Sequence, residues 1–168
     1  NCGNNKTSYG VVQNADDFTF LSTLSNLAPN TTYFYRAYAT NQFGTSYSQA
    51  TQFVTSAAPK PNIIVESVTI QSDGNNTGTA NPNESVTYNV ILKNTGNLAA
   101  TNIQADFSVG NGAVLSTSTP IIFGDILPNF TKSNQISVNI SSNTQWNTAI
   151  PVNIAIADNN GGNWTGSF

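Results

Sequence analysis

Apolar residues recur at every second position in many parts of the chain, and the pattern is clearest in residues 85–94. In this run four apolar side chains share one face of an extended strand: Val86, Tyr88, Val90 and Leu92. A two-residue period is that of a strand with one buried face. No window repeats its apolar residues with the 3.6-residue period of a helix. The pattern therefore predicts an all-β chain.

Residues 62–168 hold a series of strand-like runs, separated by turns rich in Gly, Asn and Pro. The runs span residues 63–71, 85–94, 101–109, 113–118, 121–126, 134–141, 152–157 and 164–168. Short strands at this spacing predict an immunoglobulin-like sandwich. The faces expected to form its core are Val86/Tyr88/Val90/Leu92, Ile103/Ala105/Phe107/Val109, Ile136/Val138/Ile140 and Val152/Ile154/Ile156, with Trp164 closing one end.

Residues 1–57 hold further strand-like runs at 17–21, 32–40 and 49–55, with a turn at 41–44 that supplies Asn and Gly. Residues 58–61 read A-P-K-P, and two prolines one residue apart keep such a linker extended. The sequence thus predicts two β-sandwich modules in tandem, residues 1–57 and 62–168, joined by this short linker.

Four motifs in the first module carry a resemblance: L-A-P-N-T-T-Y (27–33), R-A-Y-A-T-N (36–41), G-T-S-Y-S (44–48) and F-V-T (53–55). Together they resemble the second half of a fibronectin type III domain, in the version often found in secreted Bacteroidetes proteins. The resemblance implies that Tyr33 forms a tyrosine corner, with its hydroxyl bonding back to the chain near Leu27. A full domain has roughly 100 residues, so the module is expected to be incomplete at its N-terminus. Upstream sequence or another chain would complete it.

The second module is also similar to a known group. The segments N-P-N-E-S-V-T-Y-N-V-I-L-K-N-T-G-N-L-A-A-T-N (81–102), F-G-D-I-L-P (123–128) and A-D-N-N-G-G-N-W-T-G-S-F (157–168) resemble immunoglobulin-like modules of large secreted bacterial proteins. Such modules serve as spacers, adhesive units and enzyme accessories, so the resemblance implies a fold and leaves the role open.

The chain is poor in charge, with 8% charged residues and a formal net charge of −3 over 168 residues. Its five cationic residues are scattered and form no basic cluster of the kind that binds phosphates, so we expect no nucleic-acid partner. No apolar run approaches the roughly 20 residues of a membrane span, so we expect no direct membrane insertion.

Residues with catalytic or metal-binding side chains are scarce. The sequence has no His and a single Cys, Cys2, which excludes Ser-His and Cys-His catalysis and Cys-rich or His-based zinc sites within the chain. Glycoside chemistry needs two carboxyl groups that face each other across a cleft. Asp16 and Asp17 are adjacent, whereas Glu66, Asp106 and Asp125 lie isolated in expected strands or turns, so we expect no enzyme.

Residues 73–84 read D-G-N-N-T-G-T-A-N-P-N-E, which fits the spacing of the twelve-residue calcium loop at most positions. Gly78 occupies the sixth position, where that loop turns sharply. The candidate calcium ligands are Asp73, Asn75, Thr77, the carbonyl of Thr79, Asn81 and Glu84. With only two carboxylates we expect a weak site, with a Kd of roughly 10⁻⁴–10⁻³ M. The favoured interpretation is an Asn- and Gly-rich connection without a metal.

Two further segments offer weaker candidates. Trp146 lies in the polar run S-S-N-T-Q-W-N-T, where an exposed ring could stack on a sugar; the favoured interpretation is a loop tryptophan that caps the core. Residues 158–162, D-N-N-G-G, could form a second oxygen cluster, and the favoured interpretation is a hairpin turn.

These features predict a non-catalytic structural or adhesive spacer segment of a larger secreted or cell-surface bacterial protein. Bound calcium would stiffen the loop at 73–84, which we expect beside the junction of the two modules. The partners would be other domains of the parent chain and a surface protein or glycan. The alternative is a carbohydrate-binding accessory module that uses Trp146. A less favoured class is an enzyme fragment whose catalytic domain lies outside this chain.

Overall fold

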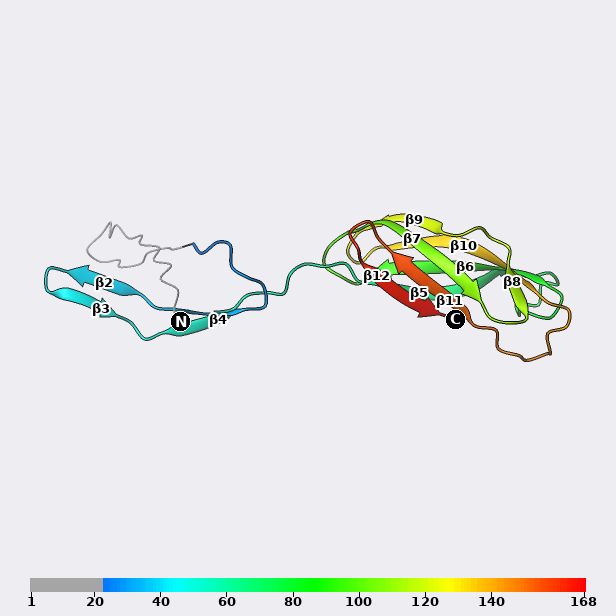
Figure 1. The fold of residues 1–168 in the computed structure, drawn as a ribbon, viewed down its shortest axis with the longest axis horizontal. Coiled ribbons are helices and arrows are strands. Elements are labelled where there is room, and N and C mark those ends of the chain that lie inside the picture. The colour runs from blue at the N-terminus through cyan, green and yellow to red at the C-terminus, as the bar shows by residue number, and fades with distance from the viewer. Residues whose placement is uncertain (1–22) are drawn as a thin grey trace. The chain divides into compact units, whose positions relative to one another are not determined.

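The computed structural model describes residues 23–168, and the chain divides into two compact units, Asn1–Ala58 and Pro59–Phe168 (Figure 1). All regular structure within residues 23–168 is β-strand, arranged in four antiparallel sheets. The predicted all-β fold is therefore confirmed. The strand-like run at residues 17–21, together with Cys2, Asp16 and Asp17, lies outside the described residues.

The first unit contains two antiparallel pairs: β1 (Thr32–Tyr35) with β4 (Thr51–Val54), and β2 (Tyr38–Asn41) with β3 (Gly44–Tyr47). The single strand expected at residues 32–40 is thus two strands. The break falls at Ala37, whose N–H donates to Ser48 Oγ at 3.0 Å and whose carbonyl accepts from the Ser48 N–H at 2.9 Å. These bonds mark the point where the chain changes its partner from β4 to β3.

Tyr33 makes the contact that the fibronectin resemblance implies for it. Its hydroxyl accepts a hydrogen bond from the Ala28 N–H at 2.8 Å, one residue after Leu27. Its ring stacks on Phe53 with 5.8 Å between the ring centroids. The phenol therefore ties the segment before β1 to the β1–β4 pair.

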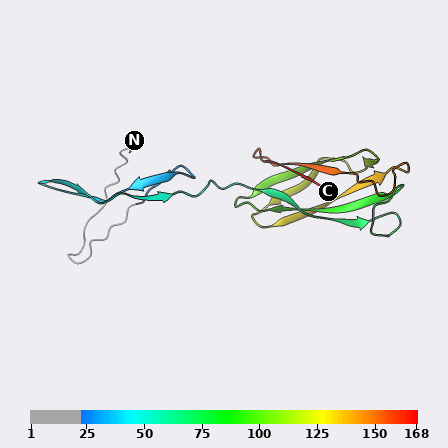
Figure 2. The same cartoon turned by 90° about the horizontal axis from the view of Figure 1, so that it is seen from below.

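The second unit is a sandwich of two four-stranded sheets that lie face to face (Figures 1 and 2). One sheet has the order β5-β6-β10-β8 and the other has the order β12-β11-β7-β9. The strands are β5 (Ile63–Ser72), β6 (Ser85–Asn94), β7 (Ala100–Val109), β8 (Ala113–Leu115), β9 (Ile121–Ile126), β10 (Thr131–Ile140), β11 (Val152–Ala157) and β12 (Asn163–Ser167). The neighbours β5-β6-β10 and β12-β11-β7 correspond to the A-B-E and G-F-C strands of an immunoglobulin sandwich.

Strand β8 is shorter than the predicted run of residues 113–118. Its ladder with β10 ends because the Ser137 N–H donates to the side-chain hydroxyl of Thr117 at 2.7 Å instead of to a backbone carbonyl. Ser116 bonds to β10 only at the Ser137 carbonyl, which accepts the Ser116 N–H at 2.8 Å.

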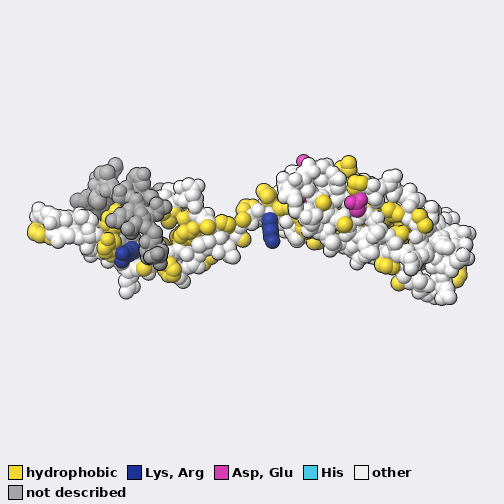
Figure 3. Space-filling model, in the orientation of Figure 1, with side chains coloured by type: hydrophobic (Ala, Val, Ile, Leu, Met, Phe, Trp, Pro, Cys, Tyr) yellow, Lys and Arg dark blue, Asp and Glu magenta, His cyan; other side chains and the backbone are white. Residues whose placement is uncertain are grey.

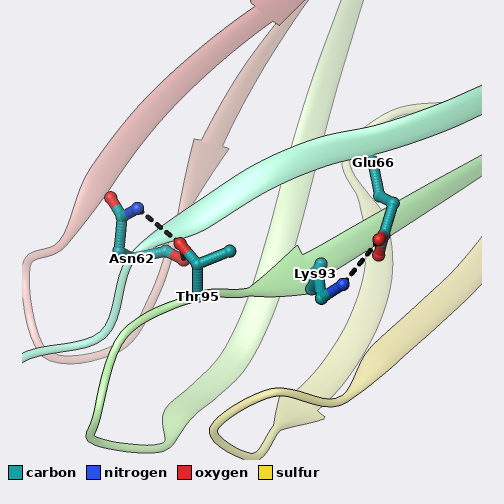
Figure 4. A network of polar contacts seen from close by, with 4 residues as sticks. All are labelled: Asn62, Glu66, Lys93 and Thr95. Carbon is teal, nitrogen blue, oxygen red and sulfur yellow. Dashed lines mark hydrogen bonds and ion pairs between the residues drawn. The ribbon is translucent and has the colours of Figure 1, made fainter.

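Strand β5 forms one edge of its sheet and is irregular. Its register against β6 shifts between Val65 and Ser67 and again between Ile70 and Ser72. Glu66, at the first of these bulges, forms an ion pair with Lys93 on β6 at 2.6 Å (Figure 4). Both side chains are about one-third exposed, so this pair contributes little to stability.

The core lies between the two sheets, and most residues of the predicted faces are buried in it. Tyr88 and Val109 are half-buried against this core, as is Trp164, which was expected to close one end. Ile140, also expected in the core, is only half-buried and does not belong to the core cluster. The faces of β5 and β9, and the first residue of β7, complete the core with side chains that the predicted faces did not include: Ile63, Ala100, Ile121, Phe123 and Ile126.

One polar residue is fully buried among these apolar side chains. The Asn94 amide oxygen accepts from the N–H groups of Asn62 at 3.1 Å and Gly96 at 2.9 Å. Its amide nitrogen donates to the carbonyls of Leu98 at 2.7 Å and Ile126 at 2.9 Å. The side chain therefore uses its full hydrogen-bonding capacity and joins the starts or ends of three strands.

The segment that leads into β5 is fastened to the loop after Asn94. The Lys60 N–H donates to Asn97 Oδ1 at 2.9 Å. The Asn62 side chain donates to Thr95 Oγ1 at 2.7 Å, as Figure 4 shows. Gly96 permits this approach, because a Cβ there would collide with the Lys60 carbonyl and the Asn62 nitrogen.

Replacing Asn94 by Ala removes all four hydrogen bonds and leaves two N–H groups and two carbonyls without these partners. Because each unsatisfied buried group costs about 1–3 kcal/mol, we expect the free energy of unfolding to fall by about 3 kcal/mol or more. Urea denaturation should show a lower midpoint with an unchanged slope. Asn153→Ala, on the exposed side of β11, is the control and should change stability by less than about 0.5 kcal/mol. A similar midpoint for both variants would contradict this role of Asn94.

Tyr88 makes the stability of the second unit depend on pH in the alkaline range. Burial raises the pKa of its hydroxyl above the ordinary value of 10.0, and its ring contacts Phe168 edge-on at 5.1 Å. The folded state thus favours the neutral phenol. The contribution of Tyr88 to the free energy of unfolding is therefore fully present below pH 10 and is lost as the pH rises through the raised pKa. We expect Tyr88→Phe to lose less stability than the wild type between about pH 9 and pH 11, as measured by urea denaturation. Parallel losses in the two proteins would disprove the assignment.

Candidate functional site

The predicted calcium residues lie in the loop that joins β5 to β6. The loop follows Ser72, the last residue of β5, so it lies at the end of these strands opposite Asn62 and Asn94. The expectation that it lies beside the linker is therefore wrong, because the ten residues of β5 separate the two. Asn76 at φ 58° and Gly78 at φ 74° give the loop its sharp reversal.

The first half of the loop closes on Asp73. Its Oδ2 accepts the Gly78 N–H at 2.7 Å and lies 3.5 Å from the Thr77 hydroxyl. Asn75 Oδ1 accepts the Thr77 N–H at 3.1 Å, a local turn in which the amide oxygen takes the place of a backbone carbonyl. Asn75 Oδ1 and Asp73 Oδ2 thus both accept backbone N–H groups, and the Asp73 carboxylate also faces the Thr77 hydroxyl.

The second half closes on Glu84 and Asn81. Glu84 Oε2 accepts the Asn81 N–H at 3.1 Å. The Asn81 amide nitrogen lies 3.2 Å from Thr77 Oγ1, 3.2 Å from both the carbonyl and the hydroxyl of Thr79, and 3.5 Å from Glu84 Oε1. An amide group has two N–H donors, so it cannot bond well to all four oxygens at once.

Five of the six predicted ligands therefore share one connected cluster: Asp73, Thr77, Thr79, Asn81 and Glu84. Carboxylate, hydroxyl and carbonyl oxygens are the ligands that calcium prefers. A half-turn of the Asn81 amide would direct its oxygen, in place of its nitrogen, towards this cluster. Within residues 23–168, no three His, Cys, Asp or Glu side chains lie close enough together to hold a metal ion, so Asp73 and Glu84 would be the only charged ligands.

Trp146 is 70% exposed, so it does not cap the sandwich core. It lies in the loop between β10 and β11, in a turn closed by the Thr148 N–H donating to the Gln145 carbonyl at 3.3 Å. Asn147 has a positive φ of 62°, which carries the chain back after the tryptophan. Of the two interpretations of Trp146, the structure favours the exposed ring.

Residues 158–162 form the hairpin turn between β11 and β12, as favoured. Asp158 Oδ1 accepts the N–H groups of Asn160 at 2.9 Å and Gly162 at 2.7 Å, and Gly161 has φ 83°. The carboxylate therefore organises the turn. Its second oxygen, Oδ2, is buried and has no hydrogen-bond partner among the described residues.

Two of the isolated carboxylates have structural contacts. Glu66 pairs with Lys93, and Asp125 Oδ1 accepts the Asn102 N–H at 2.8 Å, where β7 bulges away from β9. Asp106 points outwards from β7. On the face shown in Figure 3, the charged side chains of the second unit are few and scattered.

Comparison with known proteins adds no family. No protein-family model matches the chain, and a search of the curated proteins finds no match. The likeness to fibronectin type III and immunoglobulin-like modules thus stays a prediction from the motifs. No helix within residues 23–168 is long and apolar enough to cross a membrane.

The exposure of Trp146 can be measured by fluorescence, because the chain has one other tryptophan, the half-buried Trp164. We expect acrylamide to quench a solvent-exposed, red-shifted component of the emission, and Trp146→Phe to remove it. Trp164→Phe serves as the matched control and should leave that component in place. Equal quenching in the two variants would contradict the exposure of Trp146.

Proposed function

We propose that this chain is a non-catalytic structural and adhesive spacer segment of a larger secreted or cell-surface bacterial protein. The observation that carries the proposal is the path of the chain through the second unit. The first strand starts at one end of the sandwich, and the last strand finishes at the other end. A module of this kind suits a tandem array, because tension along the chain pulls along its strands.

The strand registers support this path. Strand β5 starts with Ile63 opposite Asn94, at the end of the sandwich where β7 begins. The turn before β12 lies at this same end, since the Asn159 N–H donates to the Thr101 carbonyl at 3.1 Å. Strand β12 then runs to Ser167, opposite Asn153, which pairs in turn with Ser108 near the end of β7. Both terminal strands thus run in the same direction in opposite sheets.

The segment before β5 also suits a spacer. Lys60 and Asn97 exchange two hydrogen bonds, from the Lys60 N–H at 2.9 Å and from the Asn97 N–H at 3.2 Å. The Thr95 N–H donates to the Asn62 carbonyl at 2.8 Å. Pulling the chain at Pro59 would therefore load these bonds together with the start of the β5–β6 ladder.

Calcium has a definite place in this proposal. The loop at residues 73–84 links the far ends of β5 and β6, and an ion shared by Asp73 and Glu84 would hold these ends together. The ion would stabilise the folded state by mass action, because the unfolded chain lacks the assembled oxygens. The role is structural, so no chemical step passes through the ion.

Calcium should raise the melting temperature of the chain. At calcium about ten times above Kd, binding adds roughly 1.4 kcal/mol, and with a Kd of roughly 10⁻⁴–10⁻³ M this needs about 1–10 mM. Differential scanning calorimetry should show a shift of a few degrees, absent in Asp73→Asn and Glu84→Gln. Glu66→Gln, a carboxylate outside the loop, is the matched control and should keep the shift. An unchanged melting temperature at 10 mM calcium, or an equal shift in all variants, would reject the calcium role.

One observation favours a second candidate function, a carbohydrate-binding accessory module. Trp146 is the most exposed large apolar side chain of the second unit, at 70%. An isolated exposed indole beside polar residues can stack on the apolar face of a sugar ring. Glycan binding that is lost in Trp146→Ala would support this function.

A further inference from the structure

We infer that the groove beside Trp146 binds an uncharged saccharide, with the indole as a stacking surface and three nearby amides as hydrogen-bonding groups. The inference rests on the second candidate function above and goes beyond it, because it assigns the groove and the chemical class of the sugar.

The groove lies between the β7–β8 turn and the β10–β11 loop and has a volume of about 320 Å³. Asn111 lines it from the first of these segments, and Asn143, Gln145 and Thr148 line it from the second. This volume is at the lower end of the range for small-ligand sites, and the groove is open to solvent. It therefore suits a short stretch of a longer polymer.

The backbone beneath the groove is fixed before any ligand binds. The Gly112 carbonyl accepts both the Ser141 N–H and the Thr144 hydroxyl at 2.8 Å. Gly112 has φ 97°, and a Cβ there would lie 2.8 Å from Thr144 Oγ1, so the close approach of the two segments requires glycine. Such a preformed floor reduces the ordering cost of binding.

The amides that line the groove are unused. The side chains of Asn111, Asn143 and Gln145 make no hydrogen bond to any residue within 23–168, and all three residues are exposed. By contrast, the side chains of Asn94 and Asn81 are engaged in the folded chain. Each free amide offers an acceptor and two donors, which match the hydroxyl groups that neighbouring carbons of a sugar present.

Trp146 supplies the apolar surface that such a site needs. It belongs to the same turn as Gln145 and Thr148, two residues of the groove wall, and its ring is 70% exposed and adjoins the groove without being one of the residues that line it. Stacking on one aromatic ring, together with a few directed hydrogen bonds, is the chemistry of sugar recognition.

The absence of charge decides which sugars fit. No Lys, Arg, Asp or Glu is among the described residues that line the groove. An acidic sugar would lose water from its carboxylate there without gaining a cationic partner. The groove therefore favours neutral hexose or pentose polymers over uronic or sialic acids.

The test applies the 168-residue chain to an array of neutral and acidic glycans. Isothermal titration calorimetry follows, with the neutral oligosaccharide that gives the strongest signal. We expect neutral glycans to bind, and Trp146→Ala to weaken binding about tenfold or more. Asn143→Ala and Gln145→Ala should each weaken it about two- to tenfold, since each removes one or two hydrogen bonds. The control is Phe130→Ala, because Phe130 is also exposed, at 64%, and its carbonyl contacts Asn94 at the other end of the sandwich.

The outcomes distinguish a wrong assignment of the groove from a wrong second candidate function. If binding is lost in Trp146→Ala but unchanged in both amide variants, or if only acidic glycans bind, the chain binds carbohydrate and the groove assignment is wrong. If no glycan binds, or if Phe130→Ala weakens binding as much as Trp146→Ala, both the groove and the second candidate function are rejected. Binding of a protein at Trp146 without any glycan would likewise overturn the inference.

Discussion

The second unit depends on one buried amide. The Asn94 side chain bonds to the segment before β5, to its own loop and to the end of β9, so it holds both sheets at one end of the sandwich. An apolar residue of similar size would fill the space but leave the N–H of Asn62 and the carbonyl of Ile126 without these partners. Asn94 also fixes the loop that receives Lys60, so the attachment of the linker follows from the same side chain.

The same kind of side chain has three different roles in this protein. Asn94 is buried and uses every donor and acceptor. Asn81 lies among the oxygens of the β5–β6 loop, where rotating its amide would exchange a donor for an acceptor. The side chains of Asn143 and Gln145 line a groove and make no hydrogen bond to the described part of the chain. Only 8% of the residues are charged, so amide side chains take most of the polar roles in this protein, and the position of each amide decides its role.

Much of the fold could be predicted from the sequence because the alternating pattern that marks a strand lies within a few consecutive residues. The alternation in residues 85–94 is complete within ten residues, and β6, β9 and β11 have the predicted bounds. The role of Asn94 could not be predicted, because its partners at Asn62 and Ile126 are each 32 positions away. The candidate calcium ligands could be chosen from their spacing within twelve residues, whereas the groove joins Asn111 to Gln145 across two loops. The turn motif G-N-G and the polar run before Trp146 were the signals of that groove, and only the fold brings them together.

The irregular edge of β5 would matter in the tandem array that we propose for this module. Neighbouring copies in such an array meet at a high effective concentration, which favours pairing between exposed strands. The two register shifts interrupt the row of N–H and carbonyl groups that a foreign strand would follow, and the Lys93–Glu66 pair places charge beside the first shift. In such an array, an edge of this kind would let each module fold beside its neighbours without exchanging strands with them.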